Sequence, residues 1–266
     1  GPVVVNTTTT TTSVFTPNGG RITVLDSIAS SSASNLTLSA SSDVLVGATI
    51  ANTGGGSLLI NANGAGGVQF NSDLVLTGGT SALTVVSSGA VTDALSTAIQ
   101  VEGLATINAG TNAITFGDSP TDTVNFGSLS LTGGAVTISE NSATVLQSVS
   151  ASTLNLTSAG SITDSGNVST TGQATLNGTS IVLGGAGETT SFGSLNFNST
   201  GAVDISLDAN TSITGSNSGF SVTLGTSGIS SFASGATLNT ASLNNASGNL
   251  TLSGNNLVNT MAVVNS

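Results

Sequence analysis

The stretch Phe126–Ser139, FGSLSLTGGAVTIS, contains the pattern that decides the fold. Apolar and polar side chains alternate through Ser128–Thr132, which is the period of a strand with one buried face. Two glycines then permit a tight corner, and Gly134–Ser139 resumes the alternation. The same elements return further along the chain as Phe192–Leu195 and Gly201–Ser206. The stretch therefore reads as one repeat of strand, corner and strand.

Alternating segments of this kind recur along the whole chain. Neighbouring segments lie roughly 20–28 residues apart, which is typical of solenoid repeats. Gly89–Asp93 also resembles Gly160–Asp164, and the offsets between such pairs are about 66–71 residues, or about three coils of roughly 22. The segments are Asn35–Ser39, Ser57–Asn61, Ala82–Val85, Ala105–Asn108, Ser128–Thr132, Thr153–Thr157, Ala174–Asn177, Ser194–Phe197, Ser221–Leu224 and Asn249–Ser253.

This pattern predicts an all-β chain folded as a right-handed parallel β-helix (β-solenoid) of about ten to eleven coils of roughly 22 residues. The handedness follows from the near-universal chirality of parallel crossovers. With one strand spacing of about 4.8 Å per coil, the coils would make a rod roughly 50 Å long. Aliphatic side chains should stack inside, and Asn side chains at the turns should form amide ladders.

The expected domain organisation is simple. Residues 21–266 should form a single β-helix repeat domain, as a fragment of a longer chain, and residues 1–20 should form a tag scar and an extended lead-in. Gly1-Pro2 resembles the scar of a protease-cleaved tag, and Thr7–Thr12 is either an extended lead-in or a glycosylated strip. The sequence shows no signal peptide and no run approaching 18 apolar residues, so we expect no membrane insertion of this segment.

The composition excludes most catalytic chemistry. The chain has one basic residue, Arg21, against 12 acidic residues, and it has no His, Cys, Trp or Tyr. Ser-His-Asp triads, Cys nucleophiles and ordinary zinc sites are therefore excluded. A surface without positive charge also gives no basis for binding nucleic acid. We expect no enzyme, no catalytic residue and no cofactor.

Asp118 and Asp122, in the loop Gly117–Asp122, are candidate calcium ligands because Ca²⁺ favours several oxygen ligands. The glycine-rich nonapeptide of calcium-binding β-rolls is absent, so a polar turn without metal is the favoured interpretation. The other acids appear scattered. Asp93 and Asp164 occupy matching repeat positions, about 15 Å apart on the predicted stack and too distant for a catalytic carboxylate pair.

The closest acidic pair in one strand is Asp204 and Asp208, which we interpret as part of a solvated face. The eight phenylalanines bear on partner binding, because a contiguous exposed apolar strip would favour a binding face. The ones expected in the core are Phe116, Phe126, Phe192 and Phe197, and the ones expected to be exposed are Phe15, Phe220 and Phe232.

The segments Gly160–Val168, Phe192–Leu195 and Gly248–Gly254 resemble the passenger repeats of filamentous-haemagglutinin-like exoproteins, which are large bacterial adhesins of the two-partner-secretion and autotransporter type. The resemblance covers about residues 20–260, at the level of composition and repeat. It implies a right-handed parallel β-helix outside a Gram-negative-type cell, acting as a stalk or adhesive shaft. The absence of Cys fits exoproteins that cross membranes unfolded.

The favoured hypothesis is therefore a non-catalytic structural shaft of a large secreted or cell-surface bacterial adhesin. A short solenoid with uncapped ends exposes unpaired strand edges, so end-to-end self-association is expected. The alternative is a binding module whose long face recognises a glycan or a host-surface protein. Ice binding and polysaccharide degradation are less favoured, because Thr-x-Thr does not recur at each coil and Arg21 is the only base.

Overall fold

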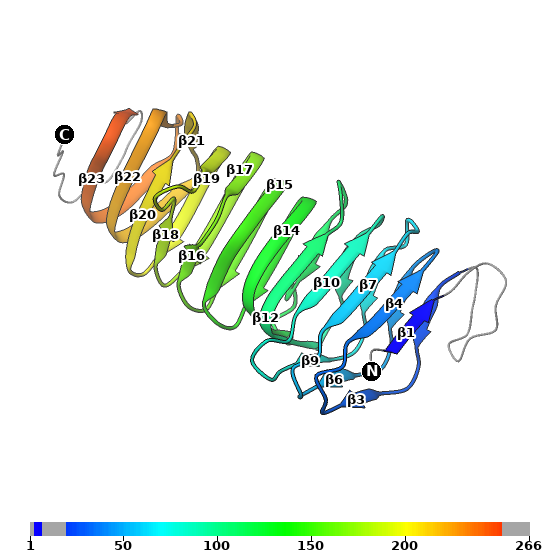
Figure 1. Cartoon of the computed structure of the whole chain (residues 1–266). Coiled ribbons are helices and arrows are strands. Elements are labelled where there is room, and N and C mark those ends of the chain that lie inside the picture. Colours follow the sequence, from blue (N-terminus) through cyan, green and yellow to red (C-terminus); the bar gives the residue numbers. More distant parts are fainter. Residues whose placement is uncertain (1–2, 7–19, 252–266) are drawn as a thin grey trace. The chain divides into compact units, whose positions relative to one another are not determined.

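The computed structural model describes residues 3–6 and 20–251. All regular secondary structure in these residues is β-strand, and they contain no helix and hence no helix that could cross a membrane. The pairings between strands are parallel, each joining a strand to one in a neighbouring coil (Figure 1). The prediction of an all-β parallel solenoid with coils of roughly 22 residues is confirmed.

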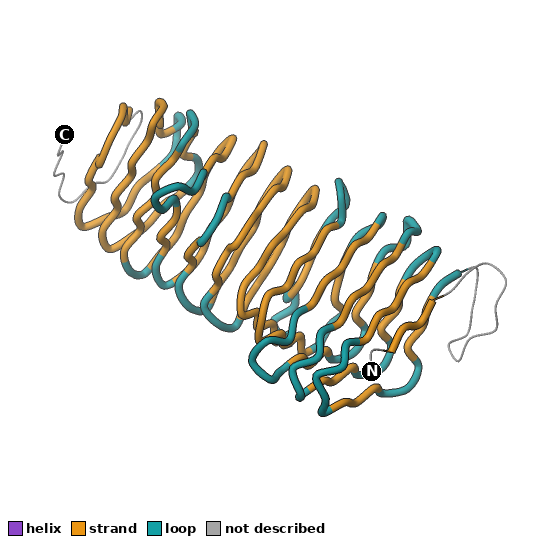
Figure 2. Tube along the Cα trace, in the orientation of Figure 1, coloured by secondary structure: helices purple, strands orange, loops and turns teal. Residues whose placement is uncertain are grey.

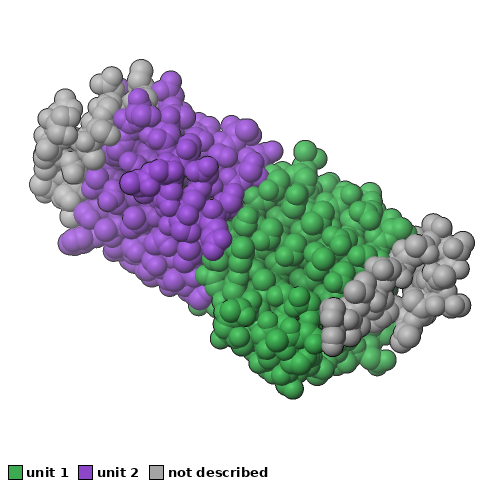
Figure 3. Space-filling model, viewed as in Figure 1, with its two compact units in different colours: residues 1–141 green, residues 142–266 purple. Residues whose placement is uncertain are grey.

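The chain divides into two compact units, residues 1–141 and residues 142–266 (Figure 3). Both are stacks of coils, but their coils differ in length. In the first unit Ile22 aligns with Val44 and Val44 with Val68, which are steps of 22 and 24 residues. In the second unit Thr144 aligns with Ile162, a step of 18 residues.

The first unit has three columns of parallel strands. One column holds β1 (Val3–Asn6), β4 (Leu36–Ala40), β7 (Leu58–Ala62), β10 (Leu83–Ser87) and the later parts of β12 (Ala98–Asn108) and β14 (Thr123–Glu140). Another holds β2 (Ile22–Val24), β5 (Val44–Val46), β8 (Val68–Phe70), β11 (Val91–Asp93), β13 (Ile114–Phe116) and the end of β14. The last holds β3 (Ile28–Ser30), β6 (Ile50–Asn52), β9 (Leu74–Leu76) and the beginnings of β12 and β14.

The second unit uses longer strands that continue through the corners, which shortens its coils. Figure 2 shows these long strand runs, whereas loops separate the short strands early in the first unit. The strands are β15 (Thr144–Ser158), β16 (Ile162–Asp164), β17 (Val168–Gly178), β18 (Ile181–Leu183), β19 (Thr190–Ser199), β20 (Ala202–Leu207), β21 (Thr211–Ile213), β22 (Ser216–Phe232) and β23 (Thr237–Thr251).

The core is the narrow interior of each stack. Alternate residues of a strand point inward, as in β7, where Leu58 and Ile60 are buried and lie in register with Leu83 and Val85 of β10. Aliphatic residues thus form columns along the stack. Such burial stabilises the fold by about 1.5–3 kcal/mol for each large side chain.

The phenylalanines behave as predicted in five of the described positions. The four expected in the core are buried, and Phe220 is 71% exposed. The prediction for Phe232 is wrong, because this residue ends β22 in register with the buried Ile213 and therefore points inward. Phe15 and the Thr7–Thr12 run lie outside the described residues.

Two further expectations can be compared with the structure. Within residues 1–20, β1 is extended as expected, and it pairs with β4 through Val3 and Leu36. Polar ladders occur on the strand faces as well as at turns. Asn198 lies in register between Asn177 and Ser218, and the Asn177 amide donates a hydrogen bond to the Thr157 hydroxyl at 3.5 Å.

Candidate functional site

The strongest candidate site is a group of three carboxylates in the first unit. Asp93 is the last residue of β11, and Asp118 and Asp122 lie in the loop between β13 and β14. Val91 and Thr92 align with Ile114 and Thr115 of the next coil, so the end of β11 lies beside the start of this loop. One carboxylate oxygen from each acid lies within 4.8 Å of the other two.

Asp93 occupies a position that is apolar in neighbouring coils. It aligns with Phe70, which aligns in turn with Val46, and both of these side chains are fully buried. In the next coil the corresponding residue is the buried Phe116. A carboxylate in such a column is costly unless hydrogen bonds or a counter-charge compensate its desolvation.

The hydrogen bonds of Asp93 fall on one carboxylate oxygen. Its Oδ2 accepts from the Gly117 backbone N–H at 3.0 Å and from the Thr97 hydroxyl at 3.3 Å. Its Oδ1 is buried and has no hydrogen-bond partner, and the residue as a whole is only 9% exposed. Burial, with the nearby charges of Asp122 and Asp118, raises the pKa of Asp93 to about 6 against the lowering effect of Gly117 N–H.

Asp122 shapes the loop around the site. Its Oδ1 accepts from the backbone N–H of Ser96 at 2.7 Å, and its Oδ2 accepts from that of Ser119 at 2.9 Å. Ser96 has a φ of 63°, the only positive φ of a non-glycine residue within the described ranges. Asp122 is buried and Asp118 is exposed, so the cluster extends from the interior to the solvent.

The second unit contains a related arrangement. Asp164 ends β16, and its Oδ2 accepts from Gly184 N–H at 2.9 Å and from the Thr190 hydroxyl at 3.4 Å. Asp208 accepts from Thr190 N–H at 2.8 Å, as Asp122 accepts weakly from Thr97 N–H at 3.4 Å. The pKa of Asp164 is raised by burial, with a contribution from the charge of Glu188.

Sequence reasoning found only part of this cluster. The loop with Asp118 and Asp122 was identified, but the expectation that the acids are scattered is wrong for these residues and Asp93. The missing signal was register: aligning Val91-Thr92 with Ile114-Thr115 places Asp93 beside Gly117. Asp204 and Asp208 are both exposed, as a solvated face requires, and Asp208 follows the end of β20.

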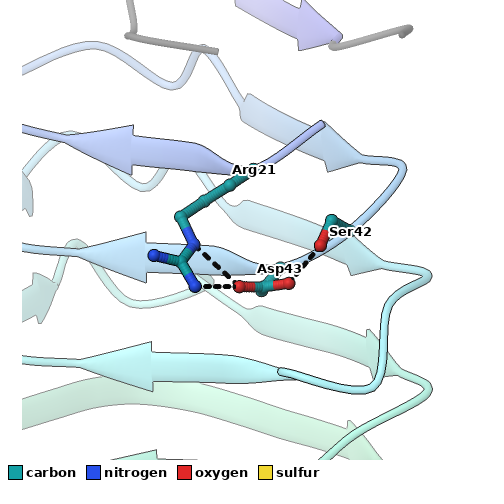
Figure 4. Close-up of polar contacts among 3 residues, drawn as sticks. All are labelled: Arg21, Ser42 and Asp43. Carbon is teal, nitrogen blue, oxygen red and sulfur yellow. Dashed lines mark hydrogen bonds and ion pairs between the residues drawn. The ribbon is translucent and has the colours of Figure 1, made fainter. Parts of the chain in front are cut away.

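The single basic side chain is already paired. Arg21 Nη2 lies 2.5 Å from Asp43 Oδ2, and Ser42 donates a hydrogen bond to the other oxygen of Asp43 (Figure 4). These contacts hold the pKa of Asp43 below its usual value, with the Ser42 hydrogen bond as the largest cause. Arg21 therefore does not balance the charge of the Asp93 cluster.

Glu102 shows how an acid can instead fasten two coils. Its Oε2 accepts from the consecutive backbone N–H groups of Gly78 and Gly79 at 2.5 and 2.6 Å. These two donors form a small anion-binding nest, and they hold the pKa of Glu102 below its usual value.

Stacked parallel coils with acids at the corners define a β-solenoid repeat protein. Residues 65–132 and 133–191 match a family model described as repeats of unknown function (DUF5649), and the two matches begin 68 residues apart. That interval agrees with the internal duplication seen in the sequence. Neither a curated protein nor a solved structure matches the chain.

Proposed function

We propose that the chain is a non-catalytic structural shaft of a secreted or cell-surface bacterial adhesin. The observation that supports this most is the uniform construction of both units from stacked parallel coils. A solenoid gains length with each coil and needs contacts only between neighbours, which suits a spacer. The resemblance to adhesin passenger repeats and the lack of Cys support an extracellular location on a Gram-negative-type bacterium.

The exposed apolar side chains also support a spacer. They come from separate strands and turns, and no two of them are register partners within the described residues. Single exposed apolar residues are normal on soluble proteins, whereas a recognition face usually has a contiguous patch. The large ones are Leu25, Val86, Leu95, Val182 and Phe220.

One observation favours the alternative of a glycan-binding face. In the second unit a shallow groove is lined by uncharged polar side chains that stack in register, among them Thr157, Asn177, Asn198 and Ser218. Amides and hydroxyls are suitable hydrogen-bond partners for sugar hydroxyls. The groove has no aromatic residue to stack on a sugar ring, so the spacer remains the better supported proposal.

Purified chain coupled to fluorescent beads tests the two functions. A shaft predicts only background binding to a glycan array and to cultured epithelial cells. Saturable binding would overturn the spacer proposal, and its loss in an Asn177→Ala/Asn198→Ala variant would assign it to the polar groove. Antibody labelling of intact producing bacteria tests location, because labelling only after lysis would contradict a surface protein.

End-to-end association is part of this proposal. At one end of the first unit, β2 and β3 pair with β5 and β6, and no other described strand pairs with them. Unpaired parallel edges favour pairing with another copy. Sedimentation velocity should therefore show association that increases with protein concentration, and a strict monomer at the highest soluble concentration would contradict it.

A further inference from the structure

We infer that Asp93, Asp118 and Asp122 form a calcium-binding site that joins neighbouring coils of the first unit. The inference does not depend on the proposed shaft function. It rests on where the chain places three carboxylates, on one carboxylate oxygen without a partner, and on the lack of any basic group to balance their charge.

The geometry brings oxygen ligands from two coils together. Asp93 comes from the end of β11, and Asp118 and Asp122 come from the loop that follows β13 one coil later. Since one oxygen of each lies within 4.8 Å of the others, a single cation can contact all three carboxylates. Exposed Asp118 leaves the solvent side open for water ligands.

Asp93 provides the independent sign of a ligand. Its side chain is 9% exposed, and its Oδ1 makes no hydrogen bond although it is buried. Buried polar atoms almost always have a partner, so a lone carboxylate oxygen in an acidic cluster indicates an unrecorded ligand. The apolar residues Phe70 and Phe116 at the corresponding positions show that the fold itself does not need a carboxylate there.

The charges cannot be balanced from within the chain. Arg21 is the only basic residue, and it pairs with Asp43. The groups facing Asp93 are two further acids and the neutral donors of Gly117 and Thr97. Carboxylates this close together in a partly buried position repel one another, and a divalent cation would reverse that repulsion.

The ligand set favours calcium among the common cations. All donors are oxygens, and the chain has no His or Cys for softer metals. Two oxygens on one Ca²⁺ can lie up to about 5 Å apart, because Ca–O bonds are about 2.3–2.6 Å. Mg²⁺, with bonds of about 2.0–2.1 Å, would require the carboxylates to move closer and to adopt a regular octahedron.

The second unit supplies a matched control. Asp164 has the same kind of position and the same two kinds of donor as Asp93, but it belongs to no such three-acid group in the described part of the chain. Glu188, the acid whose charge acts on Asp164, accepts a hydrogen bond from Gly185 N–H at 2.8 Å. Asp164→Asn therefore removes a comparable charge without touching the proposed site.

The test is calcium titration of the full chain after dialysis against EDTA, by calorimetry and by thermal unfolding followed with far-UV circular dichroism. We expect one site, with a Kd of about 10⁻⁴–10⁻³ M as in extracellular calcium modules. At about 10 mM Ca²⁺ the Tm should rise by about 5 °C. Asp118→Asn and Asp93→Asn should each weaken binding at least about tenfold, because each removes a charged ligand.

Three results would overturn the inference. The first is the absence of saturable heat and of a Tm rise up to about 10 mM Ca²⁺. The second is equal binding by wild type and Asp118→Asn, whose exposed side chain can be changed without disturbing the core. The third is an equal loss in Asp164→Asn, which would indicate general charge screening. An equal Tm rise with Mg²⁺ would contradict the assignment to calcium.

Discussion

The Asp93 carboxylate accepts a hydrogen bond from the backbone N–H of Gly117, 3.0 Å away and one coil further along the chain. Gly117 is the first residue after β13, and its φ of 71° lies in the left-handed region. That conformation turns the chain out of the strand and into the loop with Asp118 and Asp122. The contact therefore links the core column to the acidic cluster.

Gly117→Ala should destabilise the first unit by about 3 kcal/mol, because strain and a steric clash act together. An added Cβ would lie 2.3 Å from the backbone oxygen of Ser139. Urea unfolding followed by far-UV circular dichroism gives the free energy of unfolding.

The control is Gly110→Ala. Gly110 also has a positive φ, 60°, but an added Cβ would meet no atom within 4 Å. Only the backbone strain remains, at about 1 kcal/mol. Equal losses in the two variants would show that the contact with Ser139 is unimportant.

Phe116→Ala should lower the free energy of unfolding by about 3–5 kcal/mol, since it removes a buried ring and leaves a cavity. The Phe116 ring contacts those of Phe70 and Phe126, with centroids 5.9 and 5.7 Å away. In contrast, Phe220→Ala changes a side chain that is 71% exposed, and the loss should stay within about 0.5 kcal/mol. A large loss from Phe220→Ala would indicate that this ring is covered in solution, for instance by another copy.

Glu102→Gln should lower the Tm at pH 7, because the ionised carboxylate binds the N–H groups of Gly78 and Gly79. The pKa of Glu102 is lowered in the folded state, so its stabilising effect is present above the usual pKa and is lost as the pH falls through the lowered value. The Tm difference between wild type and variant should therefore disappear in acid. A difference that persists at pH 3 would assign the effect to shape alone.

Asp164→Asn tests the opposite case. Burial raises the pKa of Asp164, so its ionised form destabilises the folded state. The favourable contribution is fully present below the unfolded pKa of about 3.9 and is lost as the pH rises through the raised folded pKa. Wild type should gain stability relative to the variant as the pH falls from 7 to 4, in EDTA. A difference independent of pH would contradict a raised pKa.

Much of the fold could be predicted because solenoid register is written in local patterns. Alternation in Ser57–Asn61 correctly indicated buried Leu58 and Ile60, and the glycines correctly indicated corners. The two coil lengths were not predictable in this way, since a corner can be a loop or a bent strand with little change in composition. Phe232 was misplaced because its neighbours show no clear alternation, and only its register with Ile213 makes it point inward.

The site was only half visible for a similar reason. Asp118 and Asp122 are close in sequence, but Asp93 joins them through an alignment of β11 with β13 that depends on the lengths of the turns between them. Turn lengths vary from coil to coil, so an average period cannot align individual residues.

The central claim is that each coil is a modular unit held in register by its neighbours. The most direct measurement compares two deletions in the first unit by thermal unfolding. Deleting residues 68–90 joins Gly67 to Val91 and places Val91 over Val44, in the position that Val68 holds in the intact chain. We predict the same circular dichroism spectrum and a cooperative transition. Deleting residues 68–91 instead shifts the pattern by one residue and turns Thr92 inward, which should abolish that transition. Equal damage from both deletions would contradict the claim.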